Sequence, residues 1–493
     1  MEGLTVTAQF DQVASRHPRR VAVFWGSERI RYGELNTYIN TYAANLQHSA
    51  GVTAGARVGI LLRNGPEFVY VLYAALKSGA TVVPVNTFLK APEVQHIADD
   101  CRLTCLITEE TFSEVTGKLQ NVSVVLVSSL AQPSSKPSVQ YPTVALSDLA
   151  VIIYTSGTTG KSKGAMLTHS NIASNVWSCI RALEETESDR LTLLLPMFHS
   201  FMLTVCIFTP LSMGAGIVLI KSVQPFKLAV REIIRNRATI LVGIPQLFQA
   251  MAQAKVPFWL HWVLKLRLAV SGAAPLPHET LGVFEKKFNF PLLEGYGLSE
   301  ASPVVSFNPI RGVRKAGTVG LPLPDIDVKI FDDADRELPV DEVGEIVVRG
   351  PNVMKGYYNQ PGETEAALRT GWLHTGDMGK KDAEGYITIV DRRKEMLLVR
   401  GMNVYPREIE EVLYTFPNVH EAAVIARPDE KRGEAPIAFV SPNEGTQLNS
   451  TELLRFCRER LADYKIPREI RVVDKLPRTP TGKIAKLELK KFV

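Results

Sequence analysis

The stretch YTSGTTGKSKG at residues 154–164 has the composition of a phosphate-binding loop. Small residues let backbone N–H groups point into one concavity, and the serine and threonine hydroxyls add hydrogen-bond donors. Lys161 and Lys163 add positive charge. A Walker A loop has Gly, four residues and then Gly-Lys-Ser/Thr, but Thr155 stands where its first glycine would be. The stretch therefore predicts a phosphate loop of another type, and a flexible surface loop is the alternative.

The elements around this loop can be predicted from hydrophobic spacing. A short apolar run at residues 151–154 predicts a buried strand that leads into the loop. After the loop, apolar residues recur at helical spacing from Ile172 through Val176 to Leu183. We therefore expect the loop to lie between a sheet and a helix.

Strands and helices alternate in the earlier part of the chain. Runs rich in valine and isoleucine at residues 58–62 and 81–85 predict strands. Between them, Pro66 opens an apolar helix that Gly79 closes, which matches the preference for proline in the first turn and glycine after the last. This order predicts an α/β fold with mainly parallel sheets covered by helices.

The pattern changes twice toward the carboxyl terminus. Short alternating runs punctuated by Asp and Gly at residues 325–390 predict a β-rich, antiparallel subdomain. The last hundred residues predict a small α+β domain, and the charged segment 391–395 is the candidate joint. We therefore expect a large domain over residues 1–390 and a small mobile domain over residues 391–493.

Composition narrows the functional classes. The net charge of +5 on 493 residues comes without a Lys/Arg run, so nucleic acid is not the expected partner. Five cysteines, an odd and sparse set, favour a reducing compartment, and no signal segment is evident, so we expect a cytoplasmic protein. Residues 191–220 lack charge, but prolines and glycines divide them into a strand, a helix and a second strand of a buried core.

Further motifs give the loop a family context, because together with residues 154–164 they resemble the adenylate-forming superfamily. This superfamily includes acyl-CoA synthetases, peptide-synthetase adenylation domains and luciferases, and the sequence is most similar to bacterial-type medium- and long-chain fatty acid–CoA ligases. The matches follow the family's order over nearly the whole chain: FHSF at 198–201, SGAAP at 271–275, GYGLSE at 295–300, WLHTGD at 372–377, DRRK at 391–394, RGMNVYP at 400–406 and PTGK at 480–483.

The resemblance implies attack of a carboxylate on the α-phosphate of ATP, release of pyrophosphate, and transfer of the acyl group to the thiol of coenzyme A. These anionic reactants repel each other, so the site must supply positive charge and fixed donors. Glu300 is a hard oxygen ligand suited to Mg²⁺, and the family match adds Thr155 as a second ligand. The phosphate contacts implied are Ser156, Gly157, Thr158, Thr159, Gly160 and Lys163.

The resemblance also assigns the rest of the nucleotide. Tyr296 offers a ring that could stack on adenine, and Asp377 is an acceptor suited to ribose hydroxyls, with Arg392 beside it. Outside this context, Tyr296 would more often be a core aromatic and Asp377 a turn residue. The remaining cofactor-binding positions implied are Gly272, Ala273, Ala274, Pro275, Gly295, Gly297 and Ser299.

Three positions in the last hundred residues are assigned to the two reaction steps by resemblance. Lys483 matches the lysine that reaches the carboxylate and the α-phosphate, although a lone lysine there would normally be a solvated charge. Lys394 stands at the family's hinge position, with a surface charge as the alternative, and Gly401 lies in the loop that faces the site after rotation. Arg400 departs from the serine that is common there.

The acid pocket is expected around His199, Phe201, Met202 and Gly243. His199 stands where amino-acid adenylating domains typically have an aspartate. The surrounding segments offer no Lys, Arg or Asp for a second substrate charge, which favours an apolar acid. The leading hypothesis is a fatty acid–CoA ligase. The alternatives are an aryl-acid (4-coumarate-like) ligase, a ligase that loads an acyl carrier protein, and a non-catalytic binding protein, while peripheral membrane contact and a homodimer remain open.

Overall fold

The computed structural model describes residues 3–132, 141–155, 162–222, 226–254, 260–393, 395–399, 402–429, 433–478 and 484–492. The chain forms two compact units. The first comprises residues 1–327 and 348–373, and the second comprises residues 328–347 and 374–493. No helix in these ranges is both long and apolar enough to cross a membrane.

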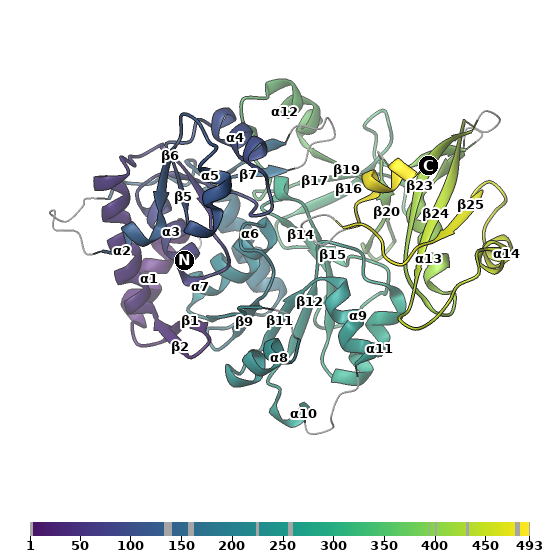
Figure 1. Cartoon of the computed structure of the whole chain (residues 1–493), viewed down its shortest axis with the longest axis horizontal. Coiled ribbons are helices and arrows are strands. Elements are labelled where there is room, and N and C mark those ends of the chain that lie inside the picture. Colours follow the sequence, from purple (N-terminus) through teal and green to yellow (C-terminus); the bar gives the residue numbers. More distant parts are fainter. Residues whose placement is uncertain are drawn as a thin grey trace. The chain divides into compact units, whose positions relative to one another are not determined.

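The first unit contains a nine-stranded sheet with the order β15-β14-β13-β12-β11-β9-β10-β1-β2. Its central pairs, from β13 to β1, are parallel, and both edges are antiparallel (Figure 1). The strands are β1 Val21–Trp25, β2 Glu28–Arg31, β9 Arg190–Leu193, β10 Gly216–Leu219, β11 Ile240–Gly243, β12 Leu268–Ser271, β13 Leu292–Gly297, β14 Val304–Phe307 and β15 Leu321–Pro322.

A second sheet of the same unit has seven strands in the order β18-β8-β7-β4-β3-β5-β6. The pairs from β7 to β6 are parallel, so the predicted parallel architecture is confirmed in both sheets. The strands are β3 Arg57–Leu61, β4 Thr81–Pro84, β5 Cys105–Thr108, β6 Ser123–Leu126, β7 Leu149–Thr155, β8 Lys163–Thr168 and β18 Gly356–Tyr357.

Helices pack on these sheets through apolar side chains. On the nine-stranded sheet, Ile233, Phe248 and Phe284 from three helices form one core with Leu241 and Leu292 of the strands. The α-helices of the first unit are α1 Val6–Arg16, α2 Tyr32–Ser49, α3 Pro66–Lys77, α4 Ala91–Asp100, α5 Ser113–Thr116, α6 His169–Ala182, α7 Thr209–Met213, α8 Phe226–Arg235, α9 Pro245–Gln253, α10 Leu260–Val263, α11 His278–Phe288 and α12 Pro361–Ala367, with a π-helical stretch at Met202–Phe208.

The second unit contains the predicted α+β segment and part of the predicted β-rich segment, since residues 348–373 of the latter belong to the first unit. A four-stranded sheet has the order β16-β17-β19-β20, with β19 and β20 antiparallel, and a five-stranded sheet carries the carboxyl-terminal helices. The expected boundary at residue 390, between a large domain and a small mobile domain, stays a prediction. The elements are β16 Asp327–Phe331, β17 Gly344–Arg349, β19 Leu373–Lys381, β20 Ile387–Arg392, β21 Leu397–Val399, β22 Met402–Val404, α13 Pro406–Tyr414, β23 Val419–Asp429, β24 Gly433–Pro442, α14 Ser450–Arg460, β25 Glu469–Val472 and α15 Lys486–Leu489.

One expectation about the phosphate loop was wrong. The loop does not lead from a sheet into a helix, because β8 follows it and pairs antiparallel with β7, placing Thr155 opposite Lys163. The helical spacing after the loop correctly predicted α6, but it does not reveal the strand before it. Thr168 then ends β8 and caps α6, since its hydroxyl accepts a hydrogen bond from the Asn171 backbone N–H at 3.1 Å. The loop therefore closes a β-hairpin.

A buried glutamate lies in the core of the first unit, just after α6. Both carboxylate oxygens of Glu185 are buried without a hydrogen-bond partner in the described part of the chain. Arg267 pairs with the neighbouring Asp189 instead, because each of the two Asp189 carboxylate oxygens accepts a hydrogen bond from Arg267 at 2.9 Å. Burial, together with the charge of Asp189, raises the pKa of Glu185 from 4.5 to about 8. Glu185 is therefore protonated in the folded chain at neutral pH.

This proton links stability to pH. The unfolded state releases it above pH 4.5 and the folded state only above about 8, so Glu185 lowers stability as pH rises through that window. The loss amounts to at most about 1.4 kcal/mol per pH unit. The substitution Glu185→Gln removes this dependence, and we expect it to stabilise the chain more at pH 8 than at pH 5, measured by urea unfolding. The exposed Glu279 of α11 supplies the control Glu279→Gln, and an equal response of both variants would contradict the assignment.

Candidate functional site

Three segments far apart in sequence meet at Glu300. This residue lies in a short turn after β13, Thr155 ends β7, and Tyr357 lies on β18. The Tyr357 hydroxyl donates a hydrogen bond to Oε1 of Glu300 at 2.9 Å, and the Thr155 hydroxyl approaches the same oxygen at 3.5 Å. Burial, reinforced by Glu300, raises the pKa of Tyr357 well above its ordinary value. The phenol therefore stays protonated and acts as a donor that orients the carboxylate.

These groups fit a magnesium ion that takes most of its ligands from phosphate and water. A carboxylate and a hydroxyl are hard oxygen ligands, and Mg²⁺ is commonly bound through one or two carboxylates together with substrate phosphates. In the ranges that the structure describes, no group of three or more His, Cys, Asp or Glu side chains could hold a metal by itself. Thr155 and Glu300 are the described residues that would hold such an ion together with a nucleotide, and their role as metal ligands stays a prediction.

Lys163 faces the same cluster from β8. It forms an ion pair with Glu363 of α12, and its Nζ lies 5.5 Å from the centre of the Tyr357 ring. The Lys163 side chain is only 10% exposed, so its charge is compensated inside the protein in this state. A phosphate would have to compete with Glu363 for this lysine, and the predicted phosphate contact of Lys163 stays a prediction.

Several predicted site residues lie outside the described residues. These are the loop positions between β7 and β8 and the three positions assigned to the two reaction steps. Thr155 and Lys163, at the ends of the two strands, flank the loop. The residues concerned are Ser156, Gly157, Thr158, Thr159, Gly160, Lys394, Gly401 and Lys483.

The predicted acid pocket and adenine wall meet at the carboxyl ends of β11 and β12. The Gly272 backbone N–H donates to the Gly243 carbonyl at 3.2 Å. A Cβ on Gly272 would lie 2.9 Å from the Phe201 ring, so glycine allows this ring to pack there. Ser200, beside Phe201, lies 3.1 Å from the Ser299 hydroxyl. Parallel α/β sheets commonly bind ligands at such strand ends.

The remaining adenine-site positions are placed by the turn after β12 and by β13. Tyr296 on β13 is 8% exposed, and its stacking role stays a prediction. The glycines beside it are required by packing, because a Cβ on Gly295 would lie 2.2 Å from Phe307 and one on Gly297 would lie 2.3 Å from the Pro303 carbonyl. Ala273 has a positive φ of 69° in the turn that also carries Ala274 and Pro275.

In the second unit, Asp377 and Arg392 lie opposite each other on β19 and β20. The Arg392 Nε lies 3.1 Å from Oδ1 of Asp377, and Asp377 is 5% exposed whereas the Arg392 side chain is 51% exposed. The structure therefore brings the predicted ribose pair together. Their contact with ribose stays a prediction.

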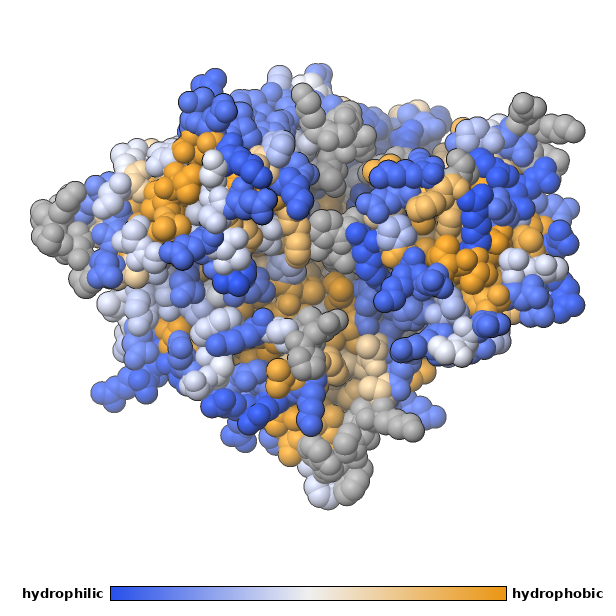
Figure 2. Space-filling model, in the orientation of Figure 1, coloured by the Kyte–Doolittle hydropathy of each residue, from blue (hydrophilic) through white to orange (hydrophobic). Residues whose placement is uncertain are grey.

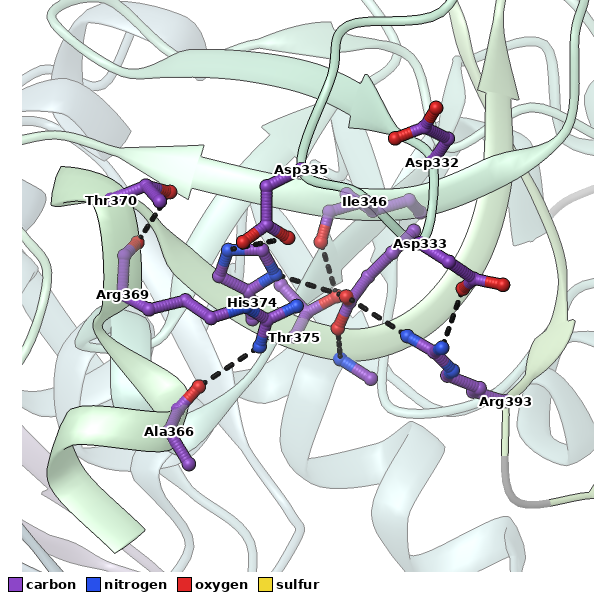
Figure 3. A network of polar contacts seen from close by, with 12 residues as sticks. Asp332, Asp333, Asp335, Ile346, Ala366, Arg369, Thr370, His374, Thr375 and Arg393 are labelled. Atoms are coloured by element: carbon purple, nitrogen blue, oxygen red, sulfur yellow. Dashed lines mark hydrogen bonds and ion pairs between the residues drawn. The ribbon is translucent and has the colours of Figure 1, made fainter. Parts of the chain in front are cut away.

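A polar network around the buried Glu345 and His374 contacts the strand that carries Asp377. The Glu345 carboxylate on β17 lies 2.9 Å from His374 Nδ1 and accepts from the Gly376 backbone N–H at 3.0 Å. Arg393 bridges Glu345 at 3.5 Å and Asp333 at 2.5 Å. Figure 3 shows the His374 ring facing Asp335 and Arg393 reaching Asp333. This network holds the start of β19 in place. It therefore positions the carboxylate of Asp377, which lies two residues after Thr375.

An apolar cavity lies near the residues of the predicted acid pocket. The His199 ring accepts through Nδ1 from the Phe201 N–H at 3.3 Å, and Met202 is fully buried. A cavity of about 60 Å³ lies beside β11, and Leu247, whose side chain covers Gly243, lines it. Its other lining residues are apolar and come from β9, β11, α8, α9, α10 and the segments around them, among them Leu194, Ala229, Ile233, Met251, Leu264 and Phe288.

Sequence reasoning missed Tyr357, Glu363 and Glu345. The hydrogen bond of Tyr357 to Glu300 spans 57 positions and the contact of Lys163 with Glu363 spans 200. No local spacing carries such a contact. The pairing of β18 with β8, which brings Tyr357 to the cluster, involves two residues of β18 and is too short to give a periodic signal.

Comparison with protein families matches both parts of the chain. The family described as AMP-binding enzyme matches residues 10–358. The family described as AMP-binding enzyme C-terminal domain matches residues 408–483. Together these matches contain the Thr155–Glu300–Tyr357 cluster and the Lys483 position.

Curated relatives match over nearly their full length. A feruloyl-CoA synthase from Amycolatopsis sp is 35% identical over 483 residues, which cover 97% of both chains. A long-chain-fatty-acid–CoA ligase from Bacillus subtilis is 34% identical over 520 residues, covering 97% of this chain and 92% of the relative. The two relatives differ in the kind of acid that they are named for.

Solved structures share the fold. ATP-bound MatB from Rhodopseudomonas palustris matches with a TM-score of 0.91 and 29% identity over 99% of both chains. The o-succinylbenzoate CoA synthetase MenE from Bacillus subtilis, in complex with its acyl-adenylate, matches with a TM-score of 0.88 and 30% identity, covering 98% of this chain and 97% of that one. The predicted fold class is confirmed.

The Tyr357 hydrogen bond predicts a defined effect on magnesium. In Tyr357→Phe, Glu300 loses the donor at 2.9 Å that orients it. Groups that orient a metal ligand typically change metal affinity by about 10- to 100-fold, so we expect the Mg²⁺ concentration for half-maximal ATP binding to rise roughly ten-fold. Isothermal titration with ATP over a Mg²⁺ series measures this.

The neighbouring tyrosine supplies the control. Tyr358 is half-buried like Tyr357, but its hydroxyl is not bonded to Glu300, so Tyr358→Phe should leave the Mg²⁺ dependence unchanged. An unchanged Mg²⁺ dependence in Tyr357→Phe would show that its hydroxyl does not orient the metal ligand.

Proposed function

The chain belongs to the AMP-binding enzyme family and is an AMP-forming acyl-CoA ligase, and we propose that its acid substrate is a fatty acid. ATP, Mg²⁺ and CoA are the usual substrates and cofactor of such ligases. The observation that carries the proposal is the cavity beside β11, which lies near the predicted acid pocket and is lined, among the residues that the structure describes, by apolar side chains.

The reaction proceeds in two steps. A carboxylate oxygen bonds to the α-phosphorus of ATP while the bond to the bridging oxygen breaks, which gives acyl-AMP and pyrophosphate. The CoA thiol then attacks the acyl carbon, so that AMP leaves and the thiol proton is released. Bound Mg²⁺ supplies positive charge at the phosphate oxygens. Thr155 and Glu300 would hold the ion, and the Tyr357 hydroxyl orients Glu300.

An apolar chain fits the surroundings of the acid pocket. The Leu247 side chain lies against Gly243 and also lines the cavity, so we expect a chain that displaces this side chain to reach an apolar space. Each buried methylene contributes about 0.8 kcal/mol to binding of the acid. None of the described residues that line the cavity is charged, which disfavours a second carboxylate or an amine on the substrate. These features support a medium- or long-chain acid.

A second candidate is an aryl acid. The relative named feruloyl-CoA synthase is as similar to this chain as the long-chain-fatty-acid–CoA ligase is, and a cavity of about 60 Å³ is small. If Leu247 stays in place above Gly243, the pocket ends there and suits a short planar acid. The two candidates therefore differ in whether the cavity is used.

The two steps are proposed to use different orientations of the small domain, residues 391–493. Lys483 supplies the charge that brings carboxylate and α-phosphate together during adenylation. Rotation at Lys394 then exchanges it for the loop that contains Gly401, which allows the thiol of CoA to approach. This assignment rests on the resemblance of these positions to family motifs.

The cysteines support a cytoplasmic location as part of the proposal. All five are free and buried. Burial raises the pKa of Cys101 and of Cys105 to about 12, so both are uncharged packing residues at neutral pH. A disulfide framework would be expected in an oxidising compartment.

The use of the cavity can be tested with Ala229, a buried residue that lines it. Acid-dependent exchange of pyrophosphate into ATP, followed by CoA consumption, is measured with octanoate, palmitate, ferulate, malonate and amino acids. We expect octanoate or palmitate to be the best substrate. Ala229→Leu should then lower kcat/KM about four-fold for each methylene that no longer fits, and so shift the preference to shorter acids.

Ala252 supplies a matched control, because it is a buried alanine of α9 that does not line the cavity. Ala252→Leu should leave the chain-length preference unchanged. Preference for ferulate with no effect of Ala229→Leu would reject the fatty acid in favour of the aryl acid.

The two-orientation mechanism predicts a separation of the half-reactions. We expect Lys483→Ala to abolish pyrophosphate exchange and to spare thioester formation from supplied acyl-adenylate, because the lysine acts in adenylation alone. Both half-reactions are measured on one preparation. Equal losses in both would contradict this role of Lys483.

A further inference from the structure

Helix α8, Phe226–Arg235, presents two different faces. Ala229 and Ile233 are buried and line the apolar cavity. Lys227, Arg231 and Arg235 are exposed, and their spacing of four residues places them in one row along the helix. The helix therefore covers the core with one face and presents a row of positive charge on the other.

Large apolar side chains are exposed beside this row. Phe226 and Leu228 of α8 are 37% and 49% exposed, and Trp262 and Val263 of α10 are 76% and 37% exposed. The two helices are neighbours, because Phe226 of α8 and Leu260 of α10 line the same cavity. Figure 2 shows apolar surface at the bottom of the view, where Figure 1 places α8 and α10. The exposed side chains of α8 and α10 are called the basic–apolar surface below.

The charge of this surface is predominantly positive. Arg237 follows α8, Lys265 follows α10, and both are exposed. The pKa of the nearby Arg29 is lowered first by burial and then by the charge of Arg235, while Glu232 acts in the opposite direction. Glu232 is the one acidic residue of α8, and its carboxylate accepts a hydrogen bond from the Asn236 side chain at 3.1 Å.

The combination of groups selects the kind of partner. A basic row alone would suit any polyanion, and an apolar patch alone would suit any apolar face. Basic side chains interleaved with exposed Leu228, Trp262 and Val263 match the boundary of a lipid bilayer, where tryptophan lies at the head-group level and aliphatic groups reach the acyl region. Lysine and arginine near such a surface are attracted by anionic lipid.

We propose that the basic–apolar surface of α8 and α10 docks on a lipid bilayer that contains anionic lipid. The cavity lies directly behind this surface, so docking places its apolar lining beside the membrane. If the acid is a fatty acid, as proposed above, docking delivers the substrate from the phase in which it dissolves. The docking itself does not depend on the identity of the acid.

Vesicle sedimentation tests this without any substrate. Wild-type protein is mixed with vesicles of phosphatidylcholine alone or of phosphatidylcholine with phosphatidylglycerol. We expect binding to the anionic vesicles that weakens as salt is added. The double variant Arg231→Glu/Arg235→Glu should weaken binding to the anionic vesicles at least five-fold per removed cation. The double variant Leu228→Ser/Trp262→Ser should weaken vesicle binding about five-fold per removed side chain, at every salt concentration.

Matched controls come from the second unit. Arg458 of α14 is exposed and Leu487 of α15 is 78% exposed, so Arg458→Glu/Leu487→Ser makes one substitution of each kind elsewhere. This variant should bind vesicles like the wild type. Pyrophosphate exchange with a short acid in detergent-free buffer checks that every variant is folded.

Three outcomes would overturn the proposal. They are no binding of wild-type protein to anionic vesicles, equal binding by the surface variants, and equal loss in the control variant. A dimer that Leu228→Ser/Trp262→Ser separates, without vesicle binding, would assign the surface to a second copy of the chain instead. Failure of vesicle binding leaves the acid-panel experiment unaffected, so the two proposals fail independently.

Discussion

The placement of one carboxylate governs the rest of the site. Glu300 can serve a metal and its phosphates only if its oxygens are correctly oriented, and the hydroxyls of Tyr357 and Thr155 contact one of these oxygens at 2.9 and 3.5 Å. The three residues come from β18, from the turn after β13 and from β7, so the cluster requires both large sheets to be formed. The reaction joins two anionic groups, and a fixed metal ligand is a means of lowering their repulsion.

In the first unit, polar and apolar side chains gather at different places. Charged and hydrogen-bonding groups gather at Glu300 and Lys163, whereas the space beside β11 is lined by apolar side chains such as Leu247 and Met251. This division suits a substrate with a charged head and an apolar tail. The exposed row on α8 continues the division at the surface, because cations lie beside apolar side chains there.

The architecture was largely predictable, and the contacts within the site were only partly so. Strong local patterns, such as Pro66 at the start of α3, predicted elements that the structure confirms, and family motifs predicted that Asp377 and Arg392 belong together. Strand β8 was not predicted, because the helical spacing of the residues after it led us to expect a helix directly after the loop. Tyr357 and Glu363 could not be found, since their contacts join distant segments through sheet pairing that no local pattern encodes.

The central claim is that Glu300, oriented by Tyr357, holds the metal on which adenylation depends. The most direct measurement is acid-dependent exchange of labelled pyrophosphate into ATP by Glu300→Gln, followed over a range of Mg²⁺ concentrations. The account predicts that the variant loses exchange at Mg²⁺ concentrations that saturate the wild type and regains part of it when Mg²⁺ is raised. Exchange at the wild-type rate with the wild-type Mg²⁺ dependence would contradict it.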